Sequence, residues 1–551
     1  MGSGMHQLET RKAEFRWTRW LFLRALAVIY CIAFLSLRVQ IEGLVGRDGI
    51  LPVEETLATV RERFPEDHVE VFPTLCWWSS SDGFLRTQCD LGIALAAMLL
   101  VDVAPVPCLV GTWVLYLSLT TAGSTFLSFQ WDALLLETGM LAILFAPLKL
   151  RPGVRRGRAP SRFQLWCLRW LLFRLMFAAG AVKLASRDEV WWDLTALALH
   201  YETQPLPTAV GWYAHQLPMN AQRFCCGAMF FIELVVPFFI FLGRRMRAVA
   251  FAVFVFFQTL ILLTGNYGFF NLLTLVLCIP LLDDAQWQRC LSVFRFRRRV
   301  IQEPRVLSED EKVGVPPSGR GRERQPRVPG PAQAASSRNL NAGNVPVTSS
   351  SLTAMGVRLR TIPPLLVGVV LLLVSCIRFA VQVDSWREQP GLRIPLPALA
   401  ERTLALVETA RAVNTYGLFA NMTETRPEIH VEGSEDGVTW KSYEFFYKPG
   451  YLSEPPCWVL PHMPRLDWQM WFAALSPRPP MWFRGFLHRL LQGSPPVLAL
   501  LRHNPFPQHP PRVVRARVQD YRFSSLETRR QSGRWWTAGE ERIYHPPVSL
   551  R

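Results

Sequence analysis

Charged side chains within apolar segments are the residues of this sequence that could do chemistry. Glu137 interrupts the apolar stretch at 126–150, and Arg174 interrupts the one at 162–184. Ionisable residues inside a membrane are costly, and they usually pair with one another or mark a functional site. At about 1.5 Å per residue, the two lie at matching depths of about 15 Å in an antiparallel helix pair. We therefore expect an intramembrane ion pair, which either faces a substrate cavity or, in the interpretation we favour, holds two helices together.

Three further charges lie in apolar segments. Asp132 lies about 140° around its helix from Glu137 and nearer the membrane surface. Lys183 is on the opposite face of its helix from Arg174, so we expect it to extend to the membrane interface. Glu233, in "FFIELVVPFF", has no partner that the sequence identifies.

Signatures of common enzymes are absent from the sequence. It contains no hydrolase elbow, phosphate-binding loop or HExxH helix. The eleven cysteines form no CxxC motif, so neither a zinc site nor a redox site is indicated. His200 and Glu202 in "HYETQ" could form an acid/base pair, but we favour a loop tied down by hydrogen bonds. We expect no catalytic, cofactor-binding or metal-binding residue, no cofactor, and a protein that is not an enzyme.

Composition and charge indicate a membrane protein. Half of the 551 residues are hydrophobic, with 20 Trp and 35 Phe, which is unusual for a soluble chain of this length. The net charge of +17 lies in short basic runs beside apolar segments, such as "FRFRRRV", as the positive-inside rule expects. Because no zinc-finger or RNP-like motif accompanies this charge, we exclude nucleic acid as a partner.

Nine apolar segments are candidate membrane spans, with a margin of two because several are shorter than about 20 residues. They lie at 17–39, 91–107, 108–122, 126–150, 162–184, 225–243, 247–265, 268–283 and 361–382. Arg11, Lys12 and Arg16 precede the first span, which predicts a cytoplasmic N-terminus. If each of the nine spans crosses the membrane from this start, the most basic loops, at 149–162, 243–247 and 289–360, lie in the cytoplasm.

The predicted fold class is a multi-pass transmembrane helical bundle followed by a β-rich luminal C-terminal domain. Residues 1–16 form a cytoplasmic N-terminus, and 17–283 form the helical domain, with luminal loops near 41–90 and 185–224. Residues 284–360 form a basic, partly disordered cytoplasmic linker, because Pro, Gly, Ser and charge dominate its sequence. The last transmembrane helix is 361–382, and 383–551 form the luminal domain with helical insertions.

Local patterns in the last part of the chain indicate its elements. Apolar and polar residues alternate on both sides of 435–437, which predicts a β-hairpin, and 512–525 alternate as a further strand. Between them, 478–493 predict an amphipathic helix closed by Gly493.

Two kinds of modification are indicated in the segments predicted to be luminal. Cys76 and Cys89 fall in one loop and are candidates for a disulfide, subject to the distance between their Cα atoms. Asn421 begins the sequon "NMT" and is a candidate for N-glycosylation.

Several segments together carry a resemblance to a known family. "FQWDALLLETG", "HYETQPLP", "IELVVPFFIFLGRR", "NTYGLF", "RLDWQMWFAAL" and "LRHNPF" occur in this order and resemble the signature segments of lipase maturation factors, from about 17 to 550. The resemblance implies a multi-pass protein of the endoplasmic reticulum membrane. It would assist the folding and assembly of secreted homodimeric lipases, such as lipoprotein lipase, through its luminal domain. A bacterial relative in the plasma membrane, with a different client, is the alternative.

The segment "RLDWQMWFAAL" holds the candidates for client binding. Trp468, Trp471, Phe472 and Leu475 share one face of a predicted helix. They form either a stripe of the domain core or an apolar surface that receives exposed patches of an incompletely folded client. Arg465 and Asp467 at its start could form a local salt bridge.

A membrane-embedded enzyme is the alternative function. Multi-pass helices with a β-rich luminal domain are broadly similar to vitamin K-dependent γ-carboxylase, in which buried polar residues act on a lipid-soluble cofactor. Glu137, Arg174, Lys183 and His200 would be the candidate residues here. The sequence leaves open the client, the oligomeric state and the source of the chain.

Overall fold

The computed structural model describes residues 14–153, 159–301, 350–386 and 398–550. Its contacts divide the chain into two units: residues 1–287 with 366–551, and residues 288–365. Most of the expected linker, 302–349, lies outside the described residues. The helical domain and the C-terminal domain both belong to the first unit.

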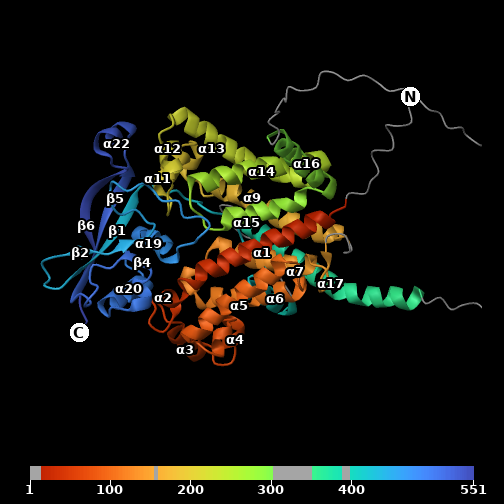
Figure 1. Ribbon diagram of the computed structural model, residues 1–551, viewed down its shortest axis with the longest axis horizontal. Coiled ribbons are helices and arrows are strands. Elements are labelled where there is room, and N and C mark those ends of the chain that lie inside the picture. The colour runs from red at the N-terminus through yellow and green to blue at the C-terminus, as the bar shows by residue number, and fades with distance from the viewer. Residues whose placement is uncertain (1–13, 154–158, 302–349, 387–397, 551) are drawn as a thin grey trace, which may run out of the picture. The chain divides into compact units, whose positions relative to one another are not determined.

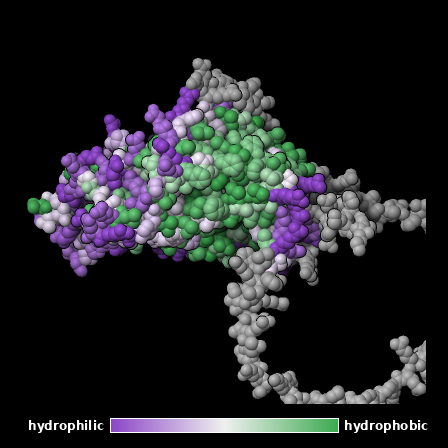
Figure 2. All heavy atoms as spheres, turned by 90° about the horizontal axis from the view of Figure 1, so that it is seen from above, coloured by the Kyte–Doolittle hydropathy of each residue, from purple (hydrophilic) through white to green (hydrophobic). Residues whose placement is uncertain are grey.

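Seven helices in the described part of the chain are long and apolar enough to cross a membrane. They are α1 (Arg16–Arg38), α5 (Asp82–Leu100), α6 (Pro105–Ala122), α9 (Arg162–Ala185), α13 (Met219–Leu234) extended by η4 (Val236–Phe241), α14 (Arg244–Thr264) and the apolar part of α17 (Ser350–Ser385). Helices satisfy their own backbone hydrogen bonds, so hydropathy alone locates them well. Figure 2 shows the resulting apolar surface between polar residues at either side.

The other two expected spans form short helices beside α1. They are α7 (Gln130–Phe145) and α15 (Phe270–Cys278), which continues into η5 (Ile279–Leu281). Near the start of α1, Phe22 packs against Phe145 with ring centroids 5.6 Å apart, and the Thr18 hydroxyl donates to the Leu282 carbonyl at 2.9 Å. Both helices therefore end where α1 begins and run antiparallel to it. Sixteen residues of helix span only about 24 Å, and burial among longer helices makes that length sufficient.

Further helices, most of them short, lie between the long ones or after the last of them. They are α2 (Ile41–Val45), α3 (Val53–Arg63), α4 (His68–Val71), η2 (Leu75–Trp77), η3 (Ser124–Phe126), α10 (Glu189–Trp192), α11 (Ala196–Thr203), α12 (Ala209–His215), α16 (Asp284–Ile301) and α18 (Ala398–Thr409). Helices α11 and α12 replace the expected loop at 185–224 with packed structure.

The C-terminal domain contains two antiparallel sheets and four short helices. One sheet has the order β2-β1-β5-β6, from β1 (Arg426–Ser434), β2 (Lys441–Ser442), β5 (Val513–Phe523) and β6 (Trp536–Val548). The other pairs β3 (Glu444–Phe445) with β4 (Leu501–His503). The helices are α19 (Arg465–Leu475), α20 (Met481–Leu491), α21 (Pro495–Leu498) and α22 (Leu526–Ser532).

The predicted hairpin and amphipathic helix are confirmed. Strand β1 pairs antiparallel with β2, and Gly437 between them has φ 78°, a conformation that suits glycine. Helix α20 ends before Gly493, whose φ of 65° forms a left-handed cap.

One hydrophobic core runs through the first unit. The same cluster of buried residues contains Trp131 of α7, Trp468 of α19 and Val518 of β5. In Figure 1 the C-terminal domain, in blue, lies where α1 ends and α2 begins. The C-terminal domain therefore packs on the helices as part of one folded body.

Candidate functional site

The helices meet the C-terminal domain at a buried polar junction. It joins α7, α9 and the segments at 200–207 and 264–267 to residues 414–419, 426 and 457–471 of the chain. Most of the segments quoted above as signatures meet here, although hundreds of residues separate them in sequence. The contacts that build the junction are ion pairs and hydrogen bonds, each described below.

Glu137 and Arg174 lie in contact at this junction. Arg174 Nη2 donates to Glu137 Oε1, and Arg174 Nη1 donates to the carbonyl of Asn414 at 2.9 Å. Glu137 Oε2 accepts from the Asn414 backbone N–H at 2.8 Å and from the Tyr416 hydroxyl at 2.7 Å. Both oxygens of the carboxylate are occupied by protein groups. The pair therefore secures the "NTYGLF" segment to the helices rather than facing a substrate.

Asp132 forms a second ion pair that the sequence did not identify. Arg465 of α19 donates to its two oxygens at 2.7 and 2.8 Å, and the Tyr116 hydroxyl donates to one of them at 2.6 Å. Arg465 is 1% exposed and Asp132 is fully buried. A bidentate pair of this kind has fixed geometry as well as charge complementarity. It orients α19 on the end of α7.

The expected local salt bridge between Arg465 and Asp467 is wrong. Arg465 is committed to Asp132, while Asp467 Oδ1 accepts from the backbone N–H groups of Tyr447 and Lys448 at 2.8 and 2.9 Å. Burial raises the pKa of Asp467 to about 6. Two residues apart on a helix, these side chains lie about 200° around the axis from each other and so meet different neighbours.

The expected position of Lys183 at the membrane interface is also wrong. Lys183 is 5% exposed, and its Nζ donates to Glu233 Oε2 at 2.6 Å. The two helices α9 and α13 pack closely, because Gly180 leaves room for Glu233 beside it. A buried partner of opposite charge at this distance makes extension to the interface unnecessary. Glu233 thus has the partner that the sequence did not identify.

Uncharged hydrogen bonds complete the junction. Gln130 and Gly417 exchange two, at 2.9 and 3.2 Å. Asn266 donates to the carbonyl of Cys457 at 2.8 Å, and Gln40 accepts from the backbone N–H of Arg465 at 2.7 Å.

The "HYETQ" segment is held by hydrogen bonds, as we favoured, but it is not a loop, because His200–Thr203 form the end of helix α11. Glu202 accepts from the backbone N–H of Phe523 at 2.9 Å, and the Tyr267 hydroxyl lies 3.0 Å from His200 Nε2. Burial, with a smaller effect of Lys183, lowers the pKa of His200 to about 4. His200 is therefore neutral at physiological pH.

The four candidates for client binding occupy two environments. Trp468 is 3% exposed and packs edge-on against Trp131 at 4.9 Å between ring centroids. Trp471 donates its indole N–H to the Thr203 carbonyl at 2.7 Å. Phe472 and Leu475 are 40% and 36% exposed. The N-terminal part of α19 enters the junction while its last turn emerges, so one helical face serves both as core and as surface.

Asn421 is exposed. Cys76 and Cys89 are free thiols, so the structure does not contain the predicted disulfide. Gln88 Nε2 lies 3.7 Å from the Cys76 sulfur. Successive side chains on a helix diverge by about 100°, so Cys89, the next residue on α5, does not share the face on which Gln88 contacts Cys76.

No cluster of three or more His, Cys, Asp or Glu side chains suited to a metal ion occurs among the described residues. The candidates for a carboxylase-like chemistry, Glu137, Arg174, Lys183 and His200, each contact a protein partner.

Comparison with known proteins gives consistent matches along the chain. Residues 17–289 match the model of the lipase maturation factor transmembrane domain, and residues 412–546 match that of the lipase maturation factor C-terminal domain. The chain is 38% identical to lipase maturation factor 2 of Homo sapiens, over 98% of this chain and 83% of that protein. It is 34% identical to lipase maturation factor 1 of Bos taurus, over 98% of this chain and 90% of that protein. No solved structure matches significantly. With seven long apolar helices in its described residues, the chain is a multi-pass membrane protein that belongs to the lipase maturation factor family.

Proposed function

We propose that this protein assists the folding and assembly of secreted homodimeric lipases, of the lipoprotein lipase type, at the endoplasmic reticulum membrane. The support comes from the family, whose members carry lipase maturation in their names, over both domains of the chain. The protein acts on its client by binding and not by catalysis. To bind a client, the C-terminal domain must be held in a fixed position on one side of the membrane. The buried polar junction attaches it rigidly to the helices.

The exposed last turn of α19 is the single observation that supports a client-binding site. Phe472 and Leu475 are exposed on a helix whose first half is held in the junction. Met481, at the start of α20, is 82% exposed. Exposed apolar side chains on a fixed scaffold suit transient contact with apolar patches of an unfinished client.

We further propose that the N-terminus is cytoplasmic and the C-terminal domain luminal. Nine crossings, the seven long helices together with α7 and α15, which run antiparallel to α1, place the two on opposite sides of the membrane. The basic residues near 149–162 and 244–247 then face the cytoplasm, in agreement with the positive-inside rule. Glycosylation of Asn421 would report this topology. We expect endoglycosidase treatment to shift the electrophoretic mobility of the parent protein and not that of Asn421→Gln.

The test of the function uses cells that lack their own maturation factor. The quantity measured is secreted lipase activity per unit mass of lipase, with and without this protein. We expect the full-length chain to raise it, and a chain truncated after Gln382 to fail although it reaches the membrane. A full-length, correctly located protein that leaves specific activity unchanged would overturn the proposal.

The surface is tested by the double variant Phe472→Ser/Leu475→Ser. We expect it to lose most of the gain in lipase activity while its unfolding temperature stays close to that of the parent. Leu526→Ser is the matched control, because Leu526 is 42% exposed on α22, a separate helix of the same domain (Figure 1). Equal loss in both variants would exclude the last turn of α19 as the client surface.

A further inference from the structure

The chain returns toward the membrane helices after the last long helix, α17. Helix α17 runs in the same direction as α9, because Gly368 lies against Phe163 and, seven residues later on both helices, the Trp170 indole donates to the Ser375 hydroxyl at 2.9 Å. The two helices therefore end on the same side of the membrane.

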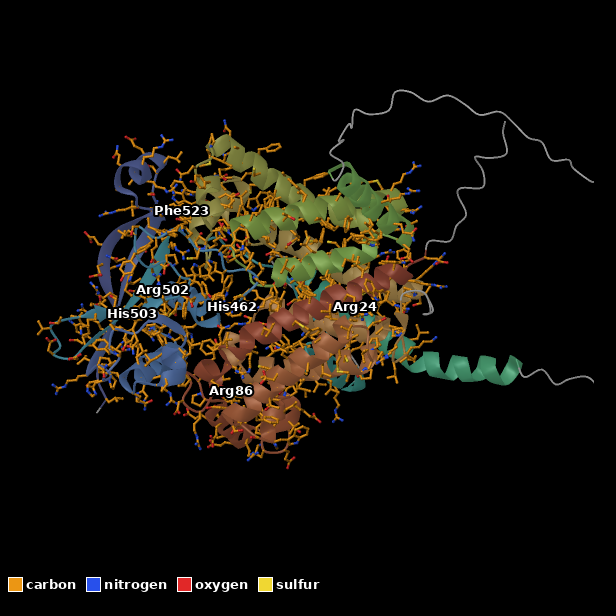
Figure 3. All side chains as sticks on the ribbon, viewed as in Figure 1. Arg24, Arg86, His462, Arg502, His503 and Phe523 are labelled. Carbon is orange, nitrogen blue, oxygen red and sulfur yellow. The ribbon has the colours of Figure 1, made fainter. Side chains whose placement is uncertain are left out.

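That side carries the C-terminal domain. Asp188, just after α9, accepts from the backbone N–H of Met422 at 2.7 Å, and Gln382, near the end of α17, donates to the carbonyl of Tyr416 at 2.5 Å. In Figure 3, His462 lies on the C-terminal domain and Arg24 lies on α1 among the membrane helices. The chain between α17 and β1 therefore has two fixed points near this side.

Between these points the backbone of Asn414 lies at the middle of the membrane. Its carbonyl accepts from Arg174 at 2.9 Å, and its N–H donates to Glu137 at 2.8 Å. Arg174 is at the middle of α9, about 17 Å from either end at about 1.5 Å per residue. Residue 414 is therefore far below the membrane surface, although it comes after the last long helix.

Ala412 and Val413 lie at a similar depth. Both are buried in one cluster with Leu371 and Val374 of α17. Val374 is close to the middle of the apolar part of α17, which is 365–385. Two neighbouring helices, α9 and α17, thus place this part of the chain at the same level.

Both arms of this excursion lead to the side of the C-terminal domain. Helix α18 contacts α4, which lies beyond the end of α1 on that side, and Glu408 near the end of α18 contacts Arg378 of α17. The returning arm reaches Gly417, which exchanges hydrogen bonds with Gln130 at the start of α7. Residues 398–416 therefore enter and leave the membrane on one side.

Protein groups satisfy the irregular backbone at the turn, as the interior of a membrane requires. The N–H groups of Ala410, Arg411 and Ala412 donate to carbonyls of α18 at 2.9, 2.8 and 3.0 Å. Asn414 has the two partners described above. These bonds allow non-helical chain to lie at this depth.

The two faces of α18 differ. Leu404 and Val407 pack on the cluster around α17, while Leu406 is 56% exposed. Glu401 and Arg402 are exposed too, but they lie in the first turn, nearest the lipid headgroups. Because Leu406 lies more than a turn further into the membrane than Glu401, the surroundings of its exposed side chain are acyl chains.

We propose that residues 398–416 form a re-entrant hairpin in the leaflet next to the C-terminal domain, and that the outer face of α18 binds the acyl chains of that leaflet. The C-terminal domain then begins near Gly417 and not at 383, where the sequence placed its start. Because the returning arm continues toward β1, the hairpin anchors the first strand of this domain in the lipid. The proposal does not depend on the identity of the client.

The test follows single cysteines in the full-length protein in phospholipid nanodiscs. In the parent, serine replaces the exposed native cysteines, which are Cys225, Cys290 and Cys457. Leu406→Cys is compared with two controls. Leu373→Cys lies on α17 within the membrane, where Leu373 is 58% exposed, and Val438→Cys lies at the β1–β2 turn, where Val438 is 80% exposed.

A charged maleimide should modify Leu406→Cys and Leu373→Cys at least about tenfold more slowly than Val438→Cys, because the thiolate that reacts forms in water. A dye on Leu406→Cys should be quenched by phospholipids with a nitroxide on the acyl chain, as at Leu373→Cys. Modification as fast as that of Val438→Cys would overturn the proposal. Slow modification without quenching would show that protein, such as a second copy of the chain, covers α18, and would overturn the assignment to lipid.

A second position tests the returning arm. Thr415 is exposed, so Thr415→Cys should be modified slowly and its dye quenched, as at Leu406→Cys. Fast modification of Thr415→Cys would show that this arm lies in water and would overturn the hairpin. Each variant should unfold at the temperature of its parent, because the replaced side chains are exposed.

Discussion

Replacing Asp132 by asparagine tests the idea that buried charges hold the C-terminal domain on the helices. Asparagine keeps the shape of the side chain and an acceptor for the Tyr116 hydroxyl. It removes the negative charge that faces Arg465, whose guanidinium is 1% exposed and bidentate on Asp132. The variant therefore leaves a buried cation without a counter-charge.

The cost follows from that burial. Breaking one side of a buried ion pair typically destabilises a protein by about 3–5 kcal/mol, while replacing both partners with apolar groups is often neutral. We therefore expect Asp132→Asn to lower the free energy of unfolding by about 3–5 kcal/mol. The double variant Asp132→Leu/Arg465→Met should recover most of that loss, and the cycle should show a coupling energy of at least about 2 kcal/mol.

The assay is thermal and denaturant unfolding of the full chain in detergent, followed by tryptophan fluorescence. Trp131 and Trp468 pack edge to face at the junction, so their emission reports separation of the two parts. Asp520→Asn is the control, because Asp520 pairs with Arg542 on the surface and should cost less than about 1 kcal/mol. If Asp132→Asn costs no more than this control, the junction is not held by its buried charges, and the rigid attachment assumed for client binding has to be abandoned.

Three further predictions concern the same body. Lys183→Met and Glu233→Met should each destabilise the protein by about 3–5 kcal/mol, and the double variant should recover most of this loss. If Lys183→Met leaves the stability unchanged, Lys183 lies at the membrane interface and not in a buried ion pair. Burial, with a smaller effect of Arg465, lowers the pKa of His462 to about 4 in the folded protein. The unfolded chain, with a histidine pKa of about 6.5, therefore takes up this proton at a higher pH than the folded protein does. The free energy of unfolding consequently falls as the pH falls from about 6.5 to 4. Denaturant unfolding at pH 7.5 and 5.5 should show that His462→Gln removes about 1.4 kcal/mol of this loss, and an unchanged difference between the two pH values would contradict it. Trp471→Phe deletes the indole donor to Thr203 and should cost about 1 kcal/mol, seen in the same unfolding measurement, and a stability equal to that of the parent would show that this hydrogen bond is not needed.

The long helices, the hairpin and the strand at 513–523 could be predicted from sequence because each depends on local pattern. A helix in a membrane satisfies its own backbone hydrogen bonds, and a turn such as the one at Gly437 depends on a few adjacent residues. The depth argument for Glu137 and Arg174 also worked, because α7 and α9 are consecutive along the chain and pack against each other. The family resemblance could also be found from sequence, because it depends only on which segments occur and in what order.

Tertiary structure decided which partner each remaining charge meets. Asp132 and Arg465 are 333 residues apart, and the position of a residue around a helix says which face it occupies but not which distant segment packs there. The same reason explains Lys183, which looked bound for the interface until α13 placed Glu233 beside it. It also explains α19, where one apolar face is buried at Trp468 and exposed at Phe472. The sequence by itself determined the long helices, the hairpin and the family of this protein. Only packing, through the desolvation of paired charges and the shape of neighbouring helices, decided how these elements join and that residues 185–224 contain helices.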